Sequence, residues 1–294
     1  MMKQKGFTLL ELLIVVTVLG VLAAGALVAY DGIGESSKGT ADANNIATID
    51  GAIRTYRVVE SNYPNQYDSL IDDTGAVIAA MSSDLQGVLG VWNQANTSGV
   101  GSAVSDAMAA VGISRLQVVQ SAGNTVLAMK AVPGGINMAH NEGAAGANAA
   151  ETAIAGTTDW AVVVSSNGAA CTAAGGTFDT TFSGTTVTNS TILNRINDSF
   201  EDDECNLVLA VGFGNDAASS TTNSTAAIAA AGASGAVDGD TYGRYIALFH
   251  VGEDDNGDGD LDDTGEIHTK PHFIGLISPK GQTVTQALNT AKGN

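Results

Sequence analysis

The sequence predicts an α+β fold in which one long N-terminal helix packs on an antiparallel β-sheet. An apolar run over residues 7–30, followed by a stretch with helical spacing of apolar residues, predicts the helix. Apolar runs of strand length, separated by tracts rich in Gly, Ala, Ser and Thr, predict the sheet in the rest of the chain.

The apolar run over residues 7–30 is long enough to cross a membrane. A helix of this length extends about 36 Å, which exceeds the hydrocarbon core of a bilayer. Glu11 is its single charged residue before Tyr30, and Lys3 and Lys5 precede it. Because positive charge is retained in the cytoplasm, we expect everything after Tyr30 to be exported.

A cleaved secretory signal peptide is the alternative interpretation of this segment. The apolar run is longer than the core of a signal peptide, and the small residues Ala23, Ala24 and Ala26 only come close to a small-x-small cleavage site. A carboxylate costs about 2.5–3.5 kcal/mol at the centre of a membrane helix and less near its end. Glu11 therefore indicates a functional requirement inside the segment.

Residues 5–11, which read KGFTLLE, resemble the processing site of type IV prepilins and of the pseudopilins of type II secretion. The resemblance continues to Tyr30 and covers only this first part of the chain. It implies a pilin-like fold and removal of a leader, residues 1–6, by cleavage between Gly6 and Phe7. It also implies methylation of the new Phe7 amine and a role in filament assembly for Glu11.

The same resemblance implies partners and a location. Copies of the chain and related pilins would form a helical filament, after processing by a prepilin peptidase and with the help of inner-membrane assembly machinery. The precursor would lie in the lipid bilayer of the inner membrane. The mature chain would lie in an extracellular filament or a periplasmic pseudopilus.

The spacing of Phe7 and Glu11 agrees with these roles. Glu11 lies about 6 Å along the helix from Phe7. After cleavage Phe7 carries a positive amine and Glu11 a negative carboxylate. We expect a staggered neighbour to pair one with the other, which sets the axial register between subunits.

The second half of the long helix is expected over residues 31–63. The helical signal weakens over residues 31–36, and apolar residues then recur on one helical face, at Ile46, Ile49, Ile53 and Tyr56. The Asn-Tyr-Pro-Asn sequence at 62–65 ends the helix.

The exported head is expected to comprise residues 64–294. Helix-like stretches occur around residues 76–91 and 103–119. The runs of strand length are residues 125–131, 160–165, 206–211, 245–251 and 272–277. The Gly-rich and Ser/Thr-rich tracts between them are interpreted as loops of a single head.

An acidic segment, residues 253–266, has metal-ligand spacing. Asp254, Asn256 and Asp258 alternate and a glycine follows, as in the first half of an EF-hand calcium loop. The twelfth position is Gly265 instead of Glu, and the flanking segments are strand-like. We therefore predict a calcium loop in a β-hairpin, with a solvated acidic turn as the alternative. The expected ligands are Asp254, Asn256, Asp258, Asp260, Asp262 and Glu266.

The two cysteines, Cys171 and Cys205, predict one disulfide, because a single pair in an exported domain usually forms a bridge. Closing a loop of roughly 33 residues would stabilise the fold by about 3–4 kcal/mol. Two unpaired buried thiols are the alternative.

Charge and motifs narrow the function classes. The net charge of −19 repels phosphate backbones, which argues against broad nucleic-acid binding. The sequence has no nucleophile elbow, P-loop, dinucleotide or zincin motif, so we assign no catalytic residue and expect no enzyme. His268 and His272 are four residues apart and near Glu266, so we also considered a metal site there. On a helix this spacing would put both side chains on one face, but these residues lie in a strand-like segment, so we do not predict the site.

Three functions remain open from the sequence. The first is a major or minor pilin of a type IV pilus-like filament, serving adhesion, twitching or DNA uptake. The second is a pseudopilin of a type II secretion system. The third is a membrane-anchored surface enzyme or sensor that uses the prepilin leader for export.

Overall fold

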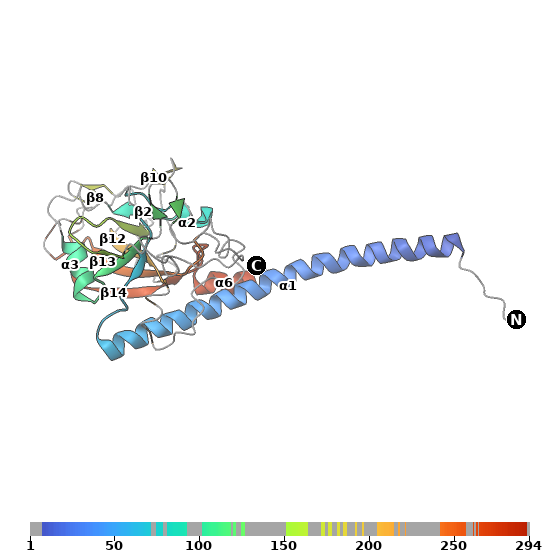
Figure 1. Cartoon of the computed structure of the whole chain (residues 1–294), viewed down its shortest axis with the longest axis horizontal. Coiled ribbons are helices and arrows are strands. Elements are labelled where there is room, and N and C mark those ends of the chain that lie inside the picture. The colour runs from blue at the N-terminus through green and yellow to red at the C-terminus, as the bar shows by residue number, and fades with distance from the viewer. Residues whose placement is uncertain are drawn as a thin grey trace.

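The structure of the chain is a computed structural model. It describes residues 8–71, 75–78, 81–92, 102–118, 120–121, 125–126, 151–163, 172–173, 176–177, 181–182, 185–186, 192, 196, 205–214, 217, 221, 242–256, 261, 263 and 265–292. Within these residues the fold is α+β, as predicted: a long N-terminal helix lies against a mainly antiparallel sheet (Figure 1).

Helix α1 (Leu9–Glu60) runs for 52 residues, about 78 Å at the usual rise. Its first half projects from the head, and its second half lies along the sheet (Figure 1). The weak helical signal over residues 31–36 does not interrupt it. The helix ends where Ser61 adopts a left-handed conformation, with φ of 59°.

One eight-stranded sheet forms the head. The strands β14 (Ile267–Ile277), β13 (Ile246–Glu253), β12 (Asn206–Gly212), β1 (Tyr67–Ser69), β3 (Arg115–Val118) and β6 (Glu151–Ala153) follow one another across it. On the edge of β12 away from β13, one end pairs with β1 and the other with β7 (Trp160–Val163), which in turn pairs with β2 (Leu89–Trp92). All these pairings are antiparallel except β1 with β3.

The sheet separates two apolar clusters because alternate side chains of a strand point to opposite faces. Ala247, Phe249 and Val251 of β13 face the cluster that contains Ile46 and Ile53 of α1. This cluster also receives side chains of α3 (Ala103–Ala110). Ile246 and Leu248 face the second cluster, on the side away from α1, which includes side chains of α2 (Ser83–Gln86).

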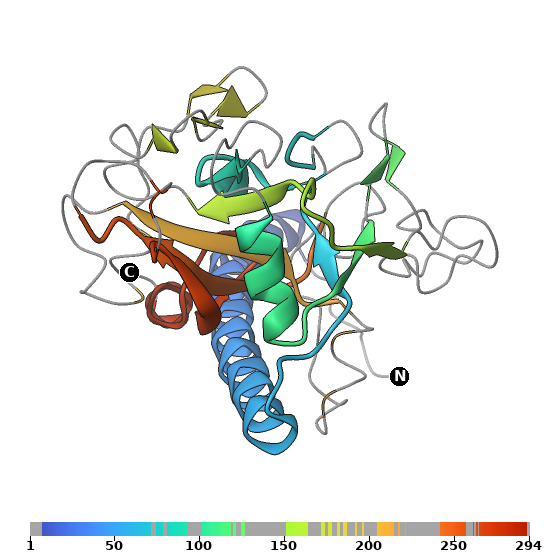
Figure 2. The same cartoon turned by 90° about the vertical axis from the view of Figure 1, so that its left-hand side faces the viewer.

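The C-terminal helix α6 (Val284–Ala291) lies beside α1, and the view along the head in Figure 2 shows the two helices next to each other. Gly39 of α1 allows this approach. A Cβ at Gly39 would lie 2.7 Å from the carbonyl oxygen of Ala287. The hydroxyl of Ser36 donates a hydrogen bond to the carbonyl of Ala291.

The predicted strands at residues 160–165, 206–211, 245–251 and 272–277 are confirmed within one to five residues at their ends. The helix-like interpretation of residues 76–91 and 103–119 is wrong in part. In the described part of the first stretch, the one-turn helix α2 is the only helix before β2 begins, and the second stretch ends in β3. Short apolar runs of this kind do not distinguish a strand from a buried helix.

The remaining short strands pair as two-residue hairpins outside the main sheet. They are β4 (Gln120–Ser121) with β5 (Thr125–Val126), β8 (Thr172–Ala173) with β9 (Gly176–Thr177), and β10 (Thr181–Phe182) with β11 (Thr185–Thr186). Of the strand predicted over residues 125–131, only residues 125–126, which form β5, lie within the described residues.

Candidate functional site

The N-terminal part of α1 exposes its apolar side chains. Among the described residues, one helical segment, Leu9–Leu27, is long and apolar enough to cross a membrane, with a mean hydropathy of 2.5. None of this segment is buried against the head. An apolar surface of this extent is unfavourable in water, so the segment is a candidate for insertion into a membrane.

Glu11 closes the first turn of this helix through a capping box with Thr8. The Glu11 carboxylate accepts hydrogen bonds of 2.9 Å from the backbone N–H of Thr8 and 2.9 Å from its hydroxyl. The Thr8 hydroxyl in turn accepts from the N–H of Glu11 at 3.3 Å. This arrangement satisfies backbone donors that no earlier helical turn can satisfy.

Gly6 and Phe7 lie outside the described residues. Cleavage between them, methylation of Phe7 and its pairing with Glu11 therefore stay predictions. The position of Glu11 is known: it is exposed one turn inside the apolar segment.

The acidic segment, residues 253–266, joins β13 to β14 as the predicted hairpin connection. Its ends are closed by a hydrogen bond of 3.0 Å from the N–H of Glu253 to the carbonyl of Glu266. Within it, Nδ2 of Asn256 donates to Oδ2 of Asp263 at 2.7 Å, and the N–H of Asp263 donates to Oε2 of Glu266 at 2.8 Å. Leu261 is fully buried in the core.

The structure places three of the six predicted calcium ligands. Asp254 and Glu266 are buried, with 6% and 2% of their surface exposed, whereas Asn256 is exposed. Asp258, Asp260 and Asp262 lie outside the described residues. Asp263, which the sequence interpretation did not include, contacts both Asn256 and Glu266. The described donors are carboxylate and amide oxygens, the chemistry that calcium prefers.

Cys205 lies at the start of β12 and is 2% exposed. It is not a free thiol, and its backbone carbonyl accepts a hydrogen bond of 2.9 Å from the N–H of Asp254. Its predicted partner, Cys171, lies outside the described residues, so the bridge between the two stays a prediction.

Comparison with known protein families gives a match in the N-terminal segment. The profile of the prokaryotic N-terminal methylation motif matches residues 1–27, which include Gly6, Phe7 and Glu11. The N-terminal segment therefore carries this methylation motif. The predicted resemblance is therefore confirmed, and the observed α+β architecture is consistent with a pilin-like fold.

One curated relative is similar to a longer part of this chain. The type II secretion system core protein G of Klebsiella pneumoniae is 31% identical to it over 84 residues. The match covers 29% of this chain and 57% of the relative, so the chain spans little more than half of the relative's length. No solved structure matches significantly.

The head brings three histidines together, His268 and His272, which the sequence analysis weighed as a metal site, and His250, which it did not include. The ring centroids of His250 and His268 are 4.8 Å apart, and those of His268 and His272 are 6.1 Å apart. Burial, followed by the two neighbouring rings, lowers the pKa of His250 from 6.5 to about 4, although a hydrogen bond to the backbone of Gly252 opposes the shift. His250 is therefore neutral near pH 7.

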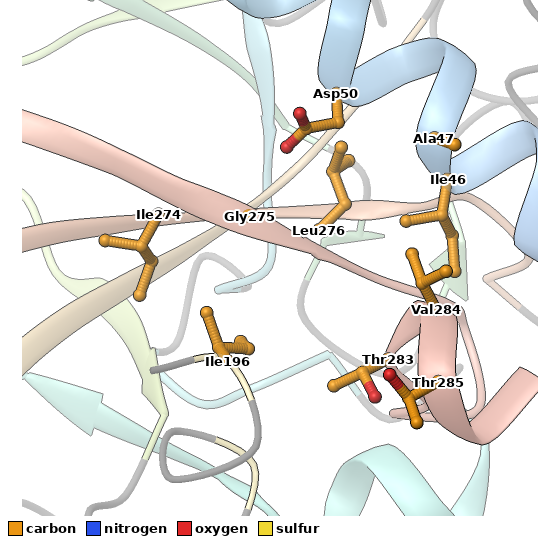
Figure 3. Close-up of a pocket in the computed structure, with 10 residues that line it drawn as sticks. All are labelled: Ile46, Ala47, Asp50, Ile196, Ile274, Gly275, Leu276, Thr283, Val284 and Thr285. Carbon is orange, nitrogen blue, oxygen red and sulfur yellow. The ribbon is translucent and has the colours of Figure 1, made fainter. Parts of the chain in front are cut away.

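A pocket of about 350 Å³ lies between α1, β14 and α6 (Figure 3). In Figure 3 the side chains of Ile46 and Val284 point toward each other across it. Asp50 lines the pocket and forms a two-point ion pair with Arg54, with distances of 2.7 and 3.2 Å. The ten lining residues are mostly apolar, with two threonine hydroxyls, and they include no nucleophile beside a base. The pocket therefore does not indicate catalysis.

Proposed function

We propose that this chain is a structural subunit of a type IV pilus-like filament, assembled through α1 after removal of the leader. One observation carries the proposal: the Leu9–Leu27 segment is wholly exposed, and it lies within the matched methylation motif. A segment of this kind has two stable surroundings, the bilayer before assembly and the α1 helices of other subunits afterwards.

Glu11 supports an exchange of partners during assembly. In the single chain its carboxylate is held by the hydroxyl and N–H of Thr8. Cleavage after Gly6 would create a positive amine at Phe7, and a neighbouring subunit displaced along the filament axis would present that amine to Glu11. The ion pair forms only between subunits in register, so it selects one axial offset while the apolar surfaces supply most of the association energy.

A second candidate is a pseudopilin of a type II secretion system, in which the filament is short and periplasmic. The similarity to core protein G of such a system favours it. Both candidates require assembly through α1, and they differ in the product: a filament outside the cell, or export of other proteins.

The assembly proposal is tested by Glu11→Gln in the native host. Glutamine keeps the capping box, so the variant removes the negative charge and leaves the helix terminus intact. Thr17→Val is the matched control, because the Thr17 hydroxyl bonds to carbonyls of its own helix, Leu13 and Ile14, at 3.1 and 2.8 Å. We expect Glu11→Gln to insert normally and to reduce filament assembly at least tenfold, with Thr17→Val unchanged.

Filaments are counted by electron microscopy after shearing, with antibody against the head, and insertion is measured by membrane fractionation. Normal filament numbers from Glu11→Gln would contradict the register role. Labelled extracellular filaments would support the pilus. Failure of protein export on deletion, with no extracellular filaments in the wild type, would support the pseudopilus.

We also propose that residues 253–266 bind calcium through their carboxylate and amide oxygens. Two predicted ligands, Asp254 and Glu266, are already buried in the closed loop. Calcium at one hundred times its Kd would stabilise the folded chain by about 2.7 kcal/mol. Asp254→Asn should abolish the increase in melting temperature, and Asp255→Asn, at the exposed neighbouring position, should retain it. An unchanged wild-type melting temperature in millimolar calcium would contradict the proposal.

A further inference from the structure

Three potential metal ligands from two strands meet at one end of the head sheet. His250 lies in β13, Glu253 is the last residue of β13, and His268 lies in β14. One ligand atom from each of these residues lies within 4.8 Å of the other two. Nε2 of His250 lies 3.9 Å from Oε2 of Glu253.

A break in strand register brings the two histidines together. His250 pairs with His272, and Gly252 pairs with Ile267. Between these two pairs β13 has only Val251, whereas β14 has residues 268–271. The extra residues of β14 form a bulge, and a bulge redirects the side chains next to it. His268 consequently contacts His250 edge to face, with an interplanar angle of 79°.

We propose that His250, Glu253 and His268 bind one divalent transition-metal ion of the zinc class. Two imidazole nitrogens and one carboxylate oxygen, with a fourth position open to water, are a known ligand set for Zn²⁺. Ligand atoms around a tetrahedral Zn²⁺ lie roughly 3.4 Å apart, given metal–ligand distances of about 2.0–2.1 Å. The observed ligand atoms lie within 4.8 Å of one another, so side-chain rotations must shorten the widest separation by up to about 1.4 Å to reach that spacing.

Burial and orientation favour a built site over a chance surface cluster. The side chain of His250 is only 12% exposed, and a hydrogen bond to the backbone of Gly252 orients its ring. Such a hydrogen bond on a ligating histidine fixes which nitrogen faces the metal. The Glu253 side chain is 42% exposed, which leaves a path for the ion to enter.

The ligand chemistry distinguishes this site from the predicted calcium ligands of the acidic segment, although Glu253 is the first residue of that segment. Calcium prefers oxygen ligands, whereas imidazole nitrogens select zinc, copper or nickel over calcium and magnesium. The site also lies on the sheet face away from α1. His250 pairs with Val208, whose side chain belongs to the apolar cluster on that face. A filament built through α1 would therefore leave the site accessible.

The test uses the full-length chain without a histidine tag, in detergent, after removal of metals with a chelator. Zinc binding is measured by calorimetry with millimolar calcium present throughout, so that the acidic segment is saturated and only the second site is observed. Cobalt(II) absorption provides an independent readout of nitrogen ligation. The variants are His250→Ala, His268→Ala and Glu253→Gln, and His140→Ala is the control histidine elsewhere in the chain.

We expect one zinc ion per wild-type chain, a loss of affinity of at least tenfold in each of the three variants, and no change in His140→Ala. Circular dichroism establishes that each variant is folded. If the buried His250 variant does not fold, the more exposed His268 and Glu253 variants decide the outcome. Absence of stoichiometric zinc binding by the wild type, or unchanged affinity in folded His268→Ala, would overturn the proposal.

Discussion

The hydroxyl of Tyr245 donates a hydrogen bond of 2.8 Å to Oδ1 of Asp42, which joins the start of β13 to α1. The same hydroxyl accepts a hydrogen bond of 3.1 Å from Nδ2 of Asn45, one turn further along α1. Tyr245 and Asp42 are both buried, with 0% and 5% exposed. This polar contact, set among apolar side chains, fixes the rotation of α1 about its own axis on the sheet.

Replacing Tyr245 with Phe should destabilise the head. The substitution keeps the ring and removes the donor to a buried carboxylate, and hydrogen bonds to charged groups contribute about 1.5–3 kcal/mol. We expect a loss of that size in the free energy of unfolding, measured by chemical denaturation. Tyr56→Phe, at a half-buried position on α1, is the control and should change stability by less than about 0.5 kcal/mol. Equal effects of the two substitutions would show that the Asp42 contact contributes nothing specific.

Gly39 should be intolerant of alanine because of α6. A Cβ at this position would lie 2.7 Å from the carbonyl oxygen of Ala287 and 2.8 Å from the backbone nitrogen of Ala291. Overpacking of this kind costs about 1–3 kcal/mol, which equals or exceeds the gain of about 1 kcal/mol in helix propensity from Gly to Ala. We expect a net decrease in melting temperature for Gly39→Ala.

Gly51→Ala provides the matched control on the same helix. Apart from the adjoining backbone of α1 itself, no heavy atom of the described residues lies within 4 Å of a Cβ built at Gly51, so helix propensity is the main change. This variant should gain about 1 kcal/mol. Calorimetric melting should therefore shift in opposite directions for the two glycines, and a gain at both would show that α6 does not pack closely on α1.

Local sequence patterns predicted the long helix and the central strands because each leaves a regular signal within a few residues. Ile46, Ile49 and Ile53 lie on one helical face, and all three are buried in the core. The helix α6 was missed although Thr283 and Gln286 form a capping box at its start. That motif, followed by apolar residues at Val284 and Leu288, is the signal that could have identified it.

The two candidate metal sites also differ in whether the sequence alone could predict them. The alternation of Asp254 and Asn256 is a local pattern, so the acidic segment could be recognised from the sequence. The contact of His250 with His268 depends on which residues of β13 and β14 are opposite each other and on the position of a bulge. Strand register is set by packing and turn geometry across the whole sheet, which a single sequence does not reveal.

The predicted bridge between Cys171 and Cys205 has a measurable consequence for stability. Closing a loop of roughly 33 residues should contribute about 3–4 kcal/mol, because it removes conformations from the unfolded chain. We therefore expect Cys171→Ala and Cys205→Ala each to lower the free energy of unfolding by about that amount. Thiol titration under denaturing conditions should detect no free thiol in the wild type before reduction.

The double variant distinguishes a bridge from two independent thiols. If the cysteines are bonded, the first substitution already breaks the bond, and the second adds little beyond its own side-chain effect. If they are independent, the two effects add, and most of the loss comes from Cys205, which is 2% exposed at the start of β12. Chemical denaturation of both single variants and the double variant measures this coupling. Because the carbonyl of Cys205 also accepts the N–H of Asp254, a strong coupling would place the disulfide next to the acidic segment.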